Sequence, residues 1–182
     1  MNTLLHTCCA PCSIYCVDSL RQEGIQPTSY WFNPNIHPYT EYRSRKTTLE
    51  EYAKSIQLPL IIDNTYGLRS FVRAVIDDLE HRCFYCYQVR LAQTARYAAE
   101  HHFDSFSTTL LVSPYQKHDA LIAAGEAAAR QYNVPFLYRD FRVGFQQGQE
   151  QAKTLDLYRQ KYCGCIFSEE ERYRWKQIQK EK

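Results

Sequence analysis

Cysteine residues gather at three places in this chain, in patterns that bind metal or pass electrons. They form the pairs Cys8 and Cys9, Cys83 and Cys86, and Cys163 and Cys165. The first pair directly follows a short apolar run at 3–6 that has the length of a strand. Because α/β proteins build their sites where strands end, we expect this pair at the carboxyl edge of a sheet.

The composition restricts what the thiols can do. The chain has 182 residues, of which 45% are hydrophobic and 23% charged, so we expect one globular domain over 1–182. There is no run of about 18 apolar residues and no secretory signal, so we expect a cytoplasmic monomer without a membrane span. Thiols stay reduced in the cytosol, where clustered cysteines are usually metal-binding or catalytic. A net charge of +2 does not by itself indicate a nucleic-acid partner.

The spacing around the first pair leaves two interpretations open. In a regular strand, Cys8 and Cys9 would point to opposite faces, so both reach one ligand only if the strand has already ended. The following Ala10-Pro11 favours such an end. Cys12 and Cys16 are then spaced i, i+4 on the next helix, where they either converge on the same ligand or are small buried core residues.

The other two pairs are also ambiguous. Cys83-x-x-Cys86 fits a redox dithiol, half a zinc site or half an iron–sulfur site, although the polar residues 77–82 before it disfavour a thioredoxin-like arrangement. Four thiolates from two distant pairs suit zinc or a [4Fe–4S] cluster equally well. The glycine in Cys163-Gly164-Cys165 permits a small strained disulfide of the electron-exchanging kind, and two inert thiols in a turn are the alternative.

Hydropathy patterning predicts an α/β fold with a mostly parallel sheet of about five strands covered by helices. Strands are expected at 3–6, 29–32, 59–62, 104–108 and 135–138. Helical spacing occurs at 13–23, 40–56, 85–101, 117–132 and 146–161, and again at 66–82. The charged tail at 168–182 has capping-box residues and is expected to form a helical C-terminal extension.

Other polar residues are expected near the same sheet edge. The rigid loop 33–38 follows the second strand, and Asp140 and Arg142 follow the fifth as a solvated pair or part of a site. A basic cluster, Arg43 with Arg45 and Lys46, either contacts phosphate or forms a solvated helix face. The architecture is similar to that of the PP-loop-like adenine nucleotide alpha hydrolases. However, the turn after the first strand lacks the glycines that hold pyrophosphate there, which argues against nucleotide hydrolysis.

Five separated blocks resemble the cobalamin-independent epoxyqueuosine reductases, across essentially the whole chain. The blocks are His6-Thr7-Cys8-Cys9-Ala10-Pro11-Cys12, Phe32 to Pro38, Arg82 to Cys86, Leu110 to His118 and Tyr158 to Cys165. The resemblance implies reduction of the epoxide of epoxyqueuosine at the wobble position of tRNA, with electrons from an external donor.

The same resemblance implies cofactors and roles for particular residues. It places a [4Fe–4S] cluster on Cys8, Cys9, Cys83 and Cys86, and a redox-active pair at Cys163 and Cys165. It also implies an additional iron bound partly by cluster thiolates and an acidic residue, for which Asp140 is our choice. Two other functions fit the residues alone: a zinc-bearing RNA-binding module without catalysis, and a metal-independent thiol–disulfide oxidoreductase.

Overall fold

A computed structural model describes the backbone of residues 1–180 and the side chains of residues 1–174. Its centre is a parallel four-stranded sheet in the order β3-β2-β1-β4. The strands are β1 (Asn2–His6), β2 (Gln26–Trp31), β3 (Leu60–Ile62) and β4 (Ser105–Thr108). The predicted parallel α/β architecture is therefore confirmed.

The fifth predicted strand, at 135–138, is reduced to a single parallel bridge between Phe106 and Phe136. It lies beside β4 through two backbone hydrogen bonds, in which Phe106 N donates to Pro135 O and Leu137 N donates to Phe106 O. Pro135 has no N–H of its own to donate, which limits ladder formation on this edge. The segment closes the sheet edge without forming a regular strand.

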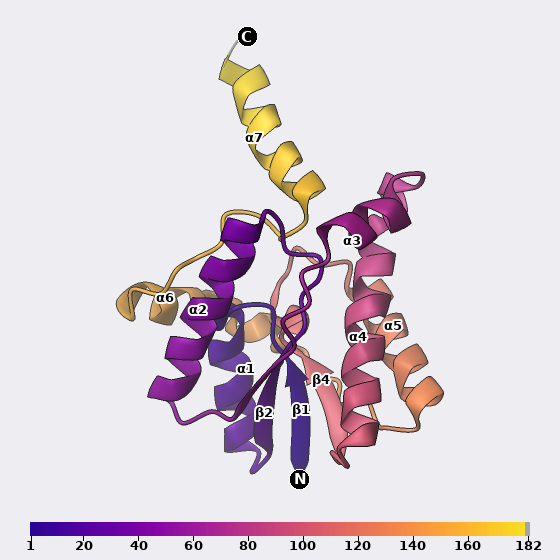
Figure 1. Ribbon diagram of the computed structural model, residues 1–182. Helices are drawn as coiled ribbons and strands as arrows, with labels where there is room; N and C mark the ends of the chain where they lie inside the picture. The colour runs from indigo at the N-terminus through magenta and orange to yellow at the C-terminus, as the bar shows by residue number, and fades with distance from the viewer. Residues whose placement is uncertain (181–182) are drawn as a thin grey trace.

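Helices cover both faces of the sheet (Figure 1). They are α1 (Ala10–Gln22), α2 (Tyr39–Ser55), α3 (Leu68–Val75), α4 (Arg82–Glu100), α5 (His118–Tyr132), α6 (Phe145–Thr154) and α7 (Ile166–Lys180). Three short 3₁₀ helices accompany them: η1 (Leu79–His81), η2 (Thr109–Val112) and η3 (Phe141–Gly144). In Figure 1, α1, α2 and α6 lie on one side of the strands, and α4 and α5 lie on the other. The charged helix α7 projects away from this body.

Three helix boundaries differ from the prediction in ways that matter for the site. α4 begins at Arg82 instead of residue 85, which puts Cys83 and Cys86 in its first turns. α6 ends at Thr154, so 155–161, predicted as helix, belongs to the irregular segment that leads to Cys163. The predicted helix at 66–82 is divided into α3 and η1. The tail is helical from Ile166, and 181–182 lie outside the described residues.

Side-chain hydrogen bonds hold the carboxyl ends of three neighbouring strands together. The His6 ring at the end of β1 contacts Thr108 Oγ1 at 2.9 Å and Phe32 O at 3.2 Å. Burial lowers the pKa of His6 to about 3, so the ring is neutral. The amide of Asn33 adds a bond from Nδ2 to Thr7 O at 2.9 Å. Because these groups are buried and bonded, the residues that follow β1 start from a fixed position.

Within the described chain, no helix is both long enough and apolar enough to cross a membrane.

Candidate functional site

Three cysteine sulfurs converge at the end of β1. The Sγ atoms of Cys8, Cys9 and Cys12 all lie within 4.8 Å of one another, and all three residues are buried. The strand ends at His6, and Cys9 caps α1 in an extended conformation with φ −174° and ψ 163°. Pro11, in the first turn, suits the start of a helix because that position needs no N–H donor. The expectation that the strand ends before the first thiol pair is confirmed, and Cys12 joins that pair.

The three thiols are not equivalent electrostatically. Hydrogen bonds from Cys12, Cys9 and Thr109 hold the pKa of Cys8 well below its ordinary value, despite burial. Burial raises the pKa of Cys9. The hydrogen bond between Cys12 and Cys8 raises the pKa of Cys12 far above its ordinary value. The lowered pKa of Cys8 favours its thiolate form, and the raised pKa values of Cys9 and Cys12 favour their thiol forms. Thiolates are the form that binds metal.

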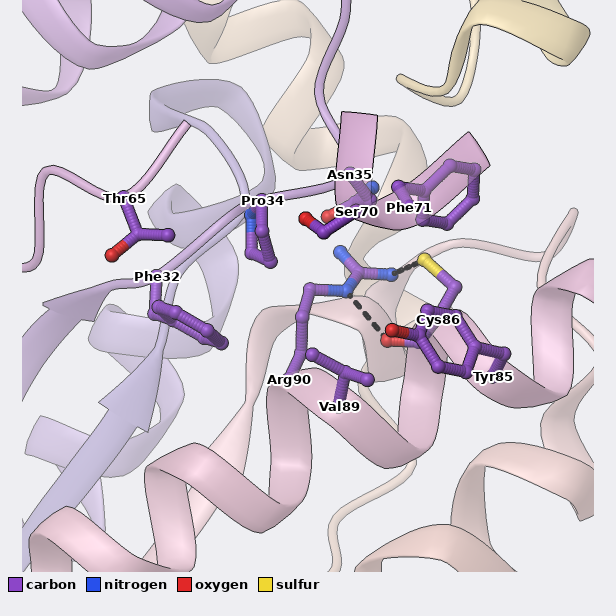
Figure 2. A pocket seen from close by; sticks show the side chains of 10 residues that line it. All are labelled: Phe32, Pro34, Asn35, Thr65, Ser70, Phe71, Tyr85, Cys86, Val89 and Arg90. Carbon is purple, nitrogen blue, oxygen red and sulfur yellow. Dashed lines mark hydrogen bonds between the residues drawn. The ribbon is translucent and has the colours of Figure 1, made fainter. Parts of the chain in front are cut away.

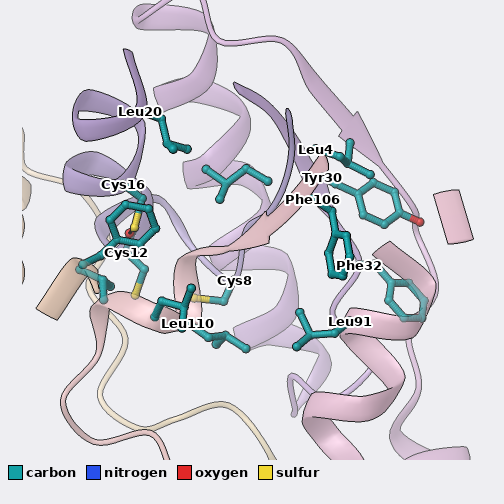
Figure 3. Packing of buried hydrophobic residues seen from close by; sticks show 14 of the residues in the cluster. Leu4, Cys8, Cys12, Cys16, Leu20, Tyr30, Phe32, Leu91, Phe106 and Leu110 are labelled. Carbon is teal, nitrogen blue, oxygen red and sulfur yellow. Dashed lines mark hydrogen bonds between the residues drawn. The ribbon is translucent and has the colours of Figure 1, made fainter. Parts of the chain in front are cut away.

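Cys16, the other i, i+4 residue, does not belong to this group. Its thiol donates to Cys12 O at 3.3 Å, and the residue is fully buried. Figure 3 shows Cys8, Cys12 and Cys16 in the apolar cluster that also contains Leu20 and Leu110. Of the two open interpretations, convergence fits Cys12 and core packing fits Cys16.

Gln160 covers the three-thiol group from the segment between α6 and α7. Its Nε2 lies 3.1 Å from Cys9 Sγ and 3.5 Å from Cys12 Sγ, donating to both. Its Oε1 is buried and has no hydrogen-bond partner among the residues whose side chains are described. Sequence analysis gave Gln160 no role, because no spacing rule relates it to cysteines that lie 151 and 148 positions away.

A second thiol group lies where α4 begins. Cys86 and Cys165 pack together with Phe71 and Val75 in one apolar cluster. Burial raises the pKa of Cys86 to about 12 and also raises the pKa of Cys83. All eight cysteines are free thiols, so the disulfide considered for Cys163 and Cys165 is not formed in this structure.

A buried arginine lies between the two thiol groups. Arg90 donates from Nη2 to Cys86 Sγ at 3.1 Å and from Nε to Cys86 O at 3.2 Å (Figure 2). Its burial alone would lower its pKa, but the neighbouring cysteine sulfurs, Cys86 first, raise it. No carboxylate among the described side chains lies within ion-pair distance of Arg90. Its counter-charge must therefore come from sulfur or from a bound group.

Arg45 fixes the loop that carries the third cysteine pair. This buried side chain pairs with Glu41 at 2.7 Å and donates to Cys163 O at 2.9 Å and to Tyr162 O at 3.0 Å. Tyr158 donates to the same Glu41 carboxylate. The basic cluster predicted for α2 is thus divided: Arg45 is buried and is neither a phosphate ligand nor a solvated residue, whereas Lys46 is half-buried and Arg43 is exposed.

The remaining predicted site residues lie apart from the three sulfurs. The group of donors within 4.8 Å of one another contains neither Cys83 nor Cys86. Asp140, our choice of acidic iron ligand, is not in the group either. It pairs with Arg142 at 2.6 Å, and that guanidinium lowers the pKa of the carboxyl to about 2. Among the described residues, the structure offers Cys12 in place of Asp140 as the additional donor beside Cys8 and Cys9.

Comparisons with known proteins concern the fold and the family of the chain. In its parallel α/β fold, the chain is similar to a crystal structure described as a predicted subunit of tRNA methyltransferase from Methanocaldococcus jannaschii. The TM-score is 0.58 at 15% identity, over 84% of this chain and 74% of that one, a likeness that concerns the fold alone.

The family is defined at the level of sequence. The family model described as epoxyqueuosine reductase QueH matches residues 3–171. The curated epoxyqueuosine reductase QueH of Dehalococcoides mccartyi is 39% identical over 170 residues, 93% of each chain. The Thermotoga maritima protein of the same description is 35% identical over 176 residues, 92% of this chain and 90% of that one. The chain belongs to the epoxyqueuosine reductase QueH family, whose members are oxidoreductases.

Proposed function

We propose that this protein reduces the epoxide of epoxyqueuosine, at the wobble position of tRNA, to the alkene of queuosine. The observation that carries the proposal is the family match over residues 3–171, which includes all eight cysteines of the chain. Breaking both C–O bonds of the epoxide requires two electrons and two protons and releases the oxygen as water. An external donor supplies the electrons.

The donor chemistry of the site fits an iron–sulfur cofactor. We propose that Cys8, Cys9, Cys83 and Cys86 hold a [4Fe–4S] cluster and that Cys12 supplies a further thiolate for an adjacent iron. When bound, these groups would deliver electrons singly and polarise the epoxide oxygen as a Lewis acid. One feature of the protein supports an anionic occupant: the Arg90 guanidinium has no carboxylate partner among the described side chains. The orphaned Oε1 of Gln160 is an acceptor, which suits a metal cation or a hydrogen-bond donor beside the three thiols.

The cysteines near α7 have a separate proposed role as a redox pair. Oxidation of Cys163 and Cys165 to a disulfide releases two electrons and two protons, which is the stoichiometry of the deoxygenation. Cys163 is exposed, so an external reductant can reach it, whereas Cys165 is buried. Replacing Cys163 by serine should slow multiple turnover and leave the iron content unchanged; wild-type rates in both single and multiple turnover would exclude this role.

The tRNA must present an unstacked base, because sequence-specific RNA readers usually engage splayed loop nucleotides. Two exposed aromatic residues follow strands at the carboxyl edge of the sheet. Tyr39, after the 33–38 loop, is 55% exposed, and Tyr115, after η2, is 84% exposed. We propose that they stack on anticodon-loop bases.

The proposed reaction is tested by reconstituting the protein with iron and sulfide without oxygen. The protein is then incubated with epoxyqueuosine-containing tRNA and dithionite, and the tRNA nucleosides are analysed by mass. The expected result is loss of one oxygen atom from the modified nucleoside, together with visible absorbance that bleaches on reduction. Persisting epoxide would contradict the proposal. A colourless, zinc-containing protein would favour an RNA-binding module, and full activity after metal removal would favour a thiol–disulfide oxidoreductase.

A further inference from the structure

A small cavity opens beside the second thiol group, lined largely by apolar side chains (Figure 2). Its walls include Phe32 and Pro34 on one side and Phe71 and Tyr85 on another. Its volume is about 150 Å³. An apolar cavity of about this size holds one benzene molecule, so the space suits a single ring and is too small for a bicyclic base.

Polar groups without partners lie at one end of this cavity. Asn35 is only 2% exposed, yet its Oδ1 has no hydrogen-bond partner in the described structure. Arg90 also lines the cavity, and its Nη1 makes none of the hydrogen bonds found among the described residues, whereas Nε and Nη2 are both engaged by Cys86. In Figure 2 the guanidinium lies between Cys86 and Asn35. A buried acceptor and a buried donor are thus left for a ligand to satisfy.

The cavity is open to solvent on one side and has a cysteine in its lining. Thr65 and Ser70, which line it, are exposed, so a ligand can enter past them. Cys86, a proposed cluster ligand, forms part of the opposite lining. A ring inside would therefore lie against a thiol of the redox site, with the Arg90 guanidinium next to that thiol, 3.1 Å from Cys86 Sγ.

We propose that this cavity receives the epoxide-bearing five-membered carbocycle of the modified nucleoside, with Arg90 donating to its oxygen substituents and Asn35 Oδ1 accepting from a hydroxyl group. The inference rests on the proposed function and adds where the reacting ring binds. The positive charge of Arg90 would stabilise negative charge that develops on the epoxide oxygen as its C–O bonds break.

The first test fills the cavity. Val89 lines the cavity and is half-buried at the edge of the main apolar core, so Val89→Phe adds volume to the cavity lining. Val143→Phe makes the same change at a site that is 80% exposed and does not line the cavity. Binding is measured by fluorescence anisotropy with two anticodon stem–loop RNAs, one carrying epoxyqueuosine and one carrying guanine at the wobble position. Val89→Phe should raise Kd for the epoxyqueuosine RNA at least about tenfold and leave the guanine RNA within about twofold. Val143→Phe should change neither.

The second test removes the unpaired acceptor. Asn35→Leu should weaken binding of the epoxyqueuosine RNA while keeping or raising the thermal midpoint, because a buried polar atom without a partner is destabilising. A lower midpoint with unchanged affinity would show that Asn35 is structural and would overturn its assignment.

The outcomes separate this inference from the reaction itself. Equal binding of both RNAs by the wild type, or equal losses for both RNAs in Val89→Phe, would overturn the cavity assignment even if the oxygen is removed in the nucleoside assay. If the wild type prefers the epoxyqueuosine RNA and Val89→Phe abolishes that preference, the cavity assignment is supported. If reduction nevertheless fails in the nucleoside assay, only the proposed reaction is contradicted.

Discussion

Replacing Arg45 by methionine should destabilise the protein strongly, because its guanidinium satisfies one buried carboxylate and two part-buried carbonyls. It pairs with Glu41 at 2.7 Å and bonds two carbonyls of the cysteine loop at 2.9 and 3.0 Å. The side chains of the ion pair are only 1% and 9% exposed, so water cannot replace the lost contacts. Leaving one member of a buried pair without its partner costs about 3–5 kcal/mol. With an m-value of about 2 kcal/mol per molar urea, the unfolding midpoint should fall by about 2 M.

Urea unfolding followed by far-UV circular dichroism measures this shift, and Arg43→Met is the matched control. Arg43 lies on the same helix but is exposed, so its replacement should change stability by no more than about 0.5 kcal/mol. Adding Glu41→Gln to Arg45→Met should recover about half of the loss, because it removes the stranded charge and leaves an acceptor for Tyr158. A midpoint for Arg45→Met close to that of Arg43→Met would refute the reasoning.

Three further changes test other parts of the structure. Burial lowers the pKa of His37 to about 4, so the unfolded state binds its proton more readily, and His37 alone should lower stability by about 1–2 kcal/mol between pH 7 and 5. Buried His6 acts in the same direction, so His37→Gln should reduce but not abolish the dependence in urea unfolding at several pH values. Gly164→Ala should cost about 1–3 kcal/mol in thermal unfolding, because φ is +152° and an added Cβ would lie 3.3 Å from Ile36; an unchanged midpoint would contradict the strain argument. Gln160→Ala should speed alkylation of Cys9 and Cys12 about tenfold, as measured by mass mapping of labelled peptides, and should cost about 1 kcal/mol of stability. Equal labelling rates in the variant and the wild type would show that Gln160 does not shield the two thiols.

The parts of the site that depend on local sequence were predictable. An apolar run followed by Cys8 and Cys9, with Pro11 close behind, indicates a strand that ends just before a helix begins, and the structure has that arrangement. The approximate positions of the four strands and of most helices could be predicted from hydropathy periodicity, because this pattern too depends on local sequence. The segment at 135–138 did not form a full strand, because hydropathy cannot show how many ladder bonds a proline-containing edge can make.

The features that depend on distant contacts were not predictable from spacing. The sequence predicts Arg45 to be one member of a basic cluster on a helix. In the structure it is buried, because its partners include backbone carbonyls 117 and 118 positions away. Arg90 occupies an ordinary position in a helix, and its role depends on having no carboxylate partner among the side chains that the structure describes. Asp140 is a different case: its partner Arg142 is only two residues away, and the sequence had already indicated this pair as one of two alternatives.

The unequal protonation of the three thiols at the end of β1 affects how the site can be filled. The pKa of Cys8 is lowered, whereas the pKa values of Cys9 and Cys12 are raised, which favours protons on Cys9 and Cys12. Loading a cation there must expel those protons into the surrounding buffer. Assembly of the centre should therefore be favoured in mildly alkaline solution and opposed by acidification.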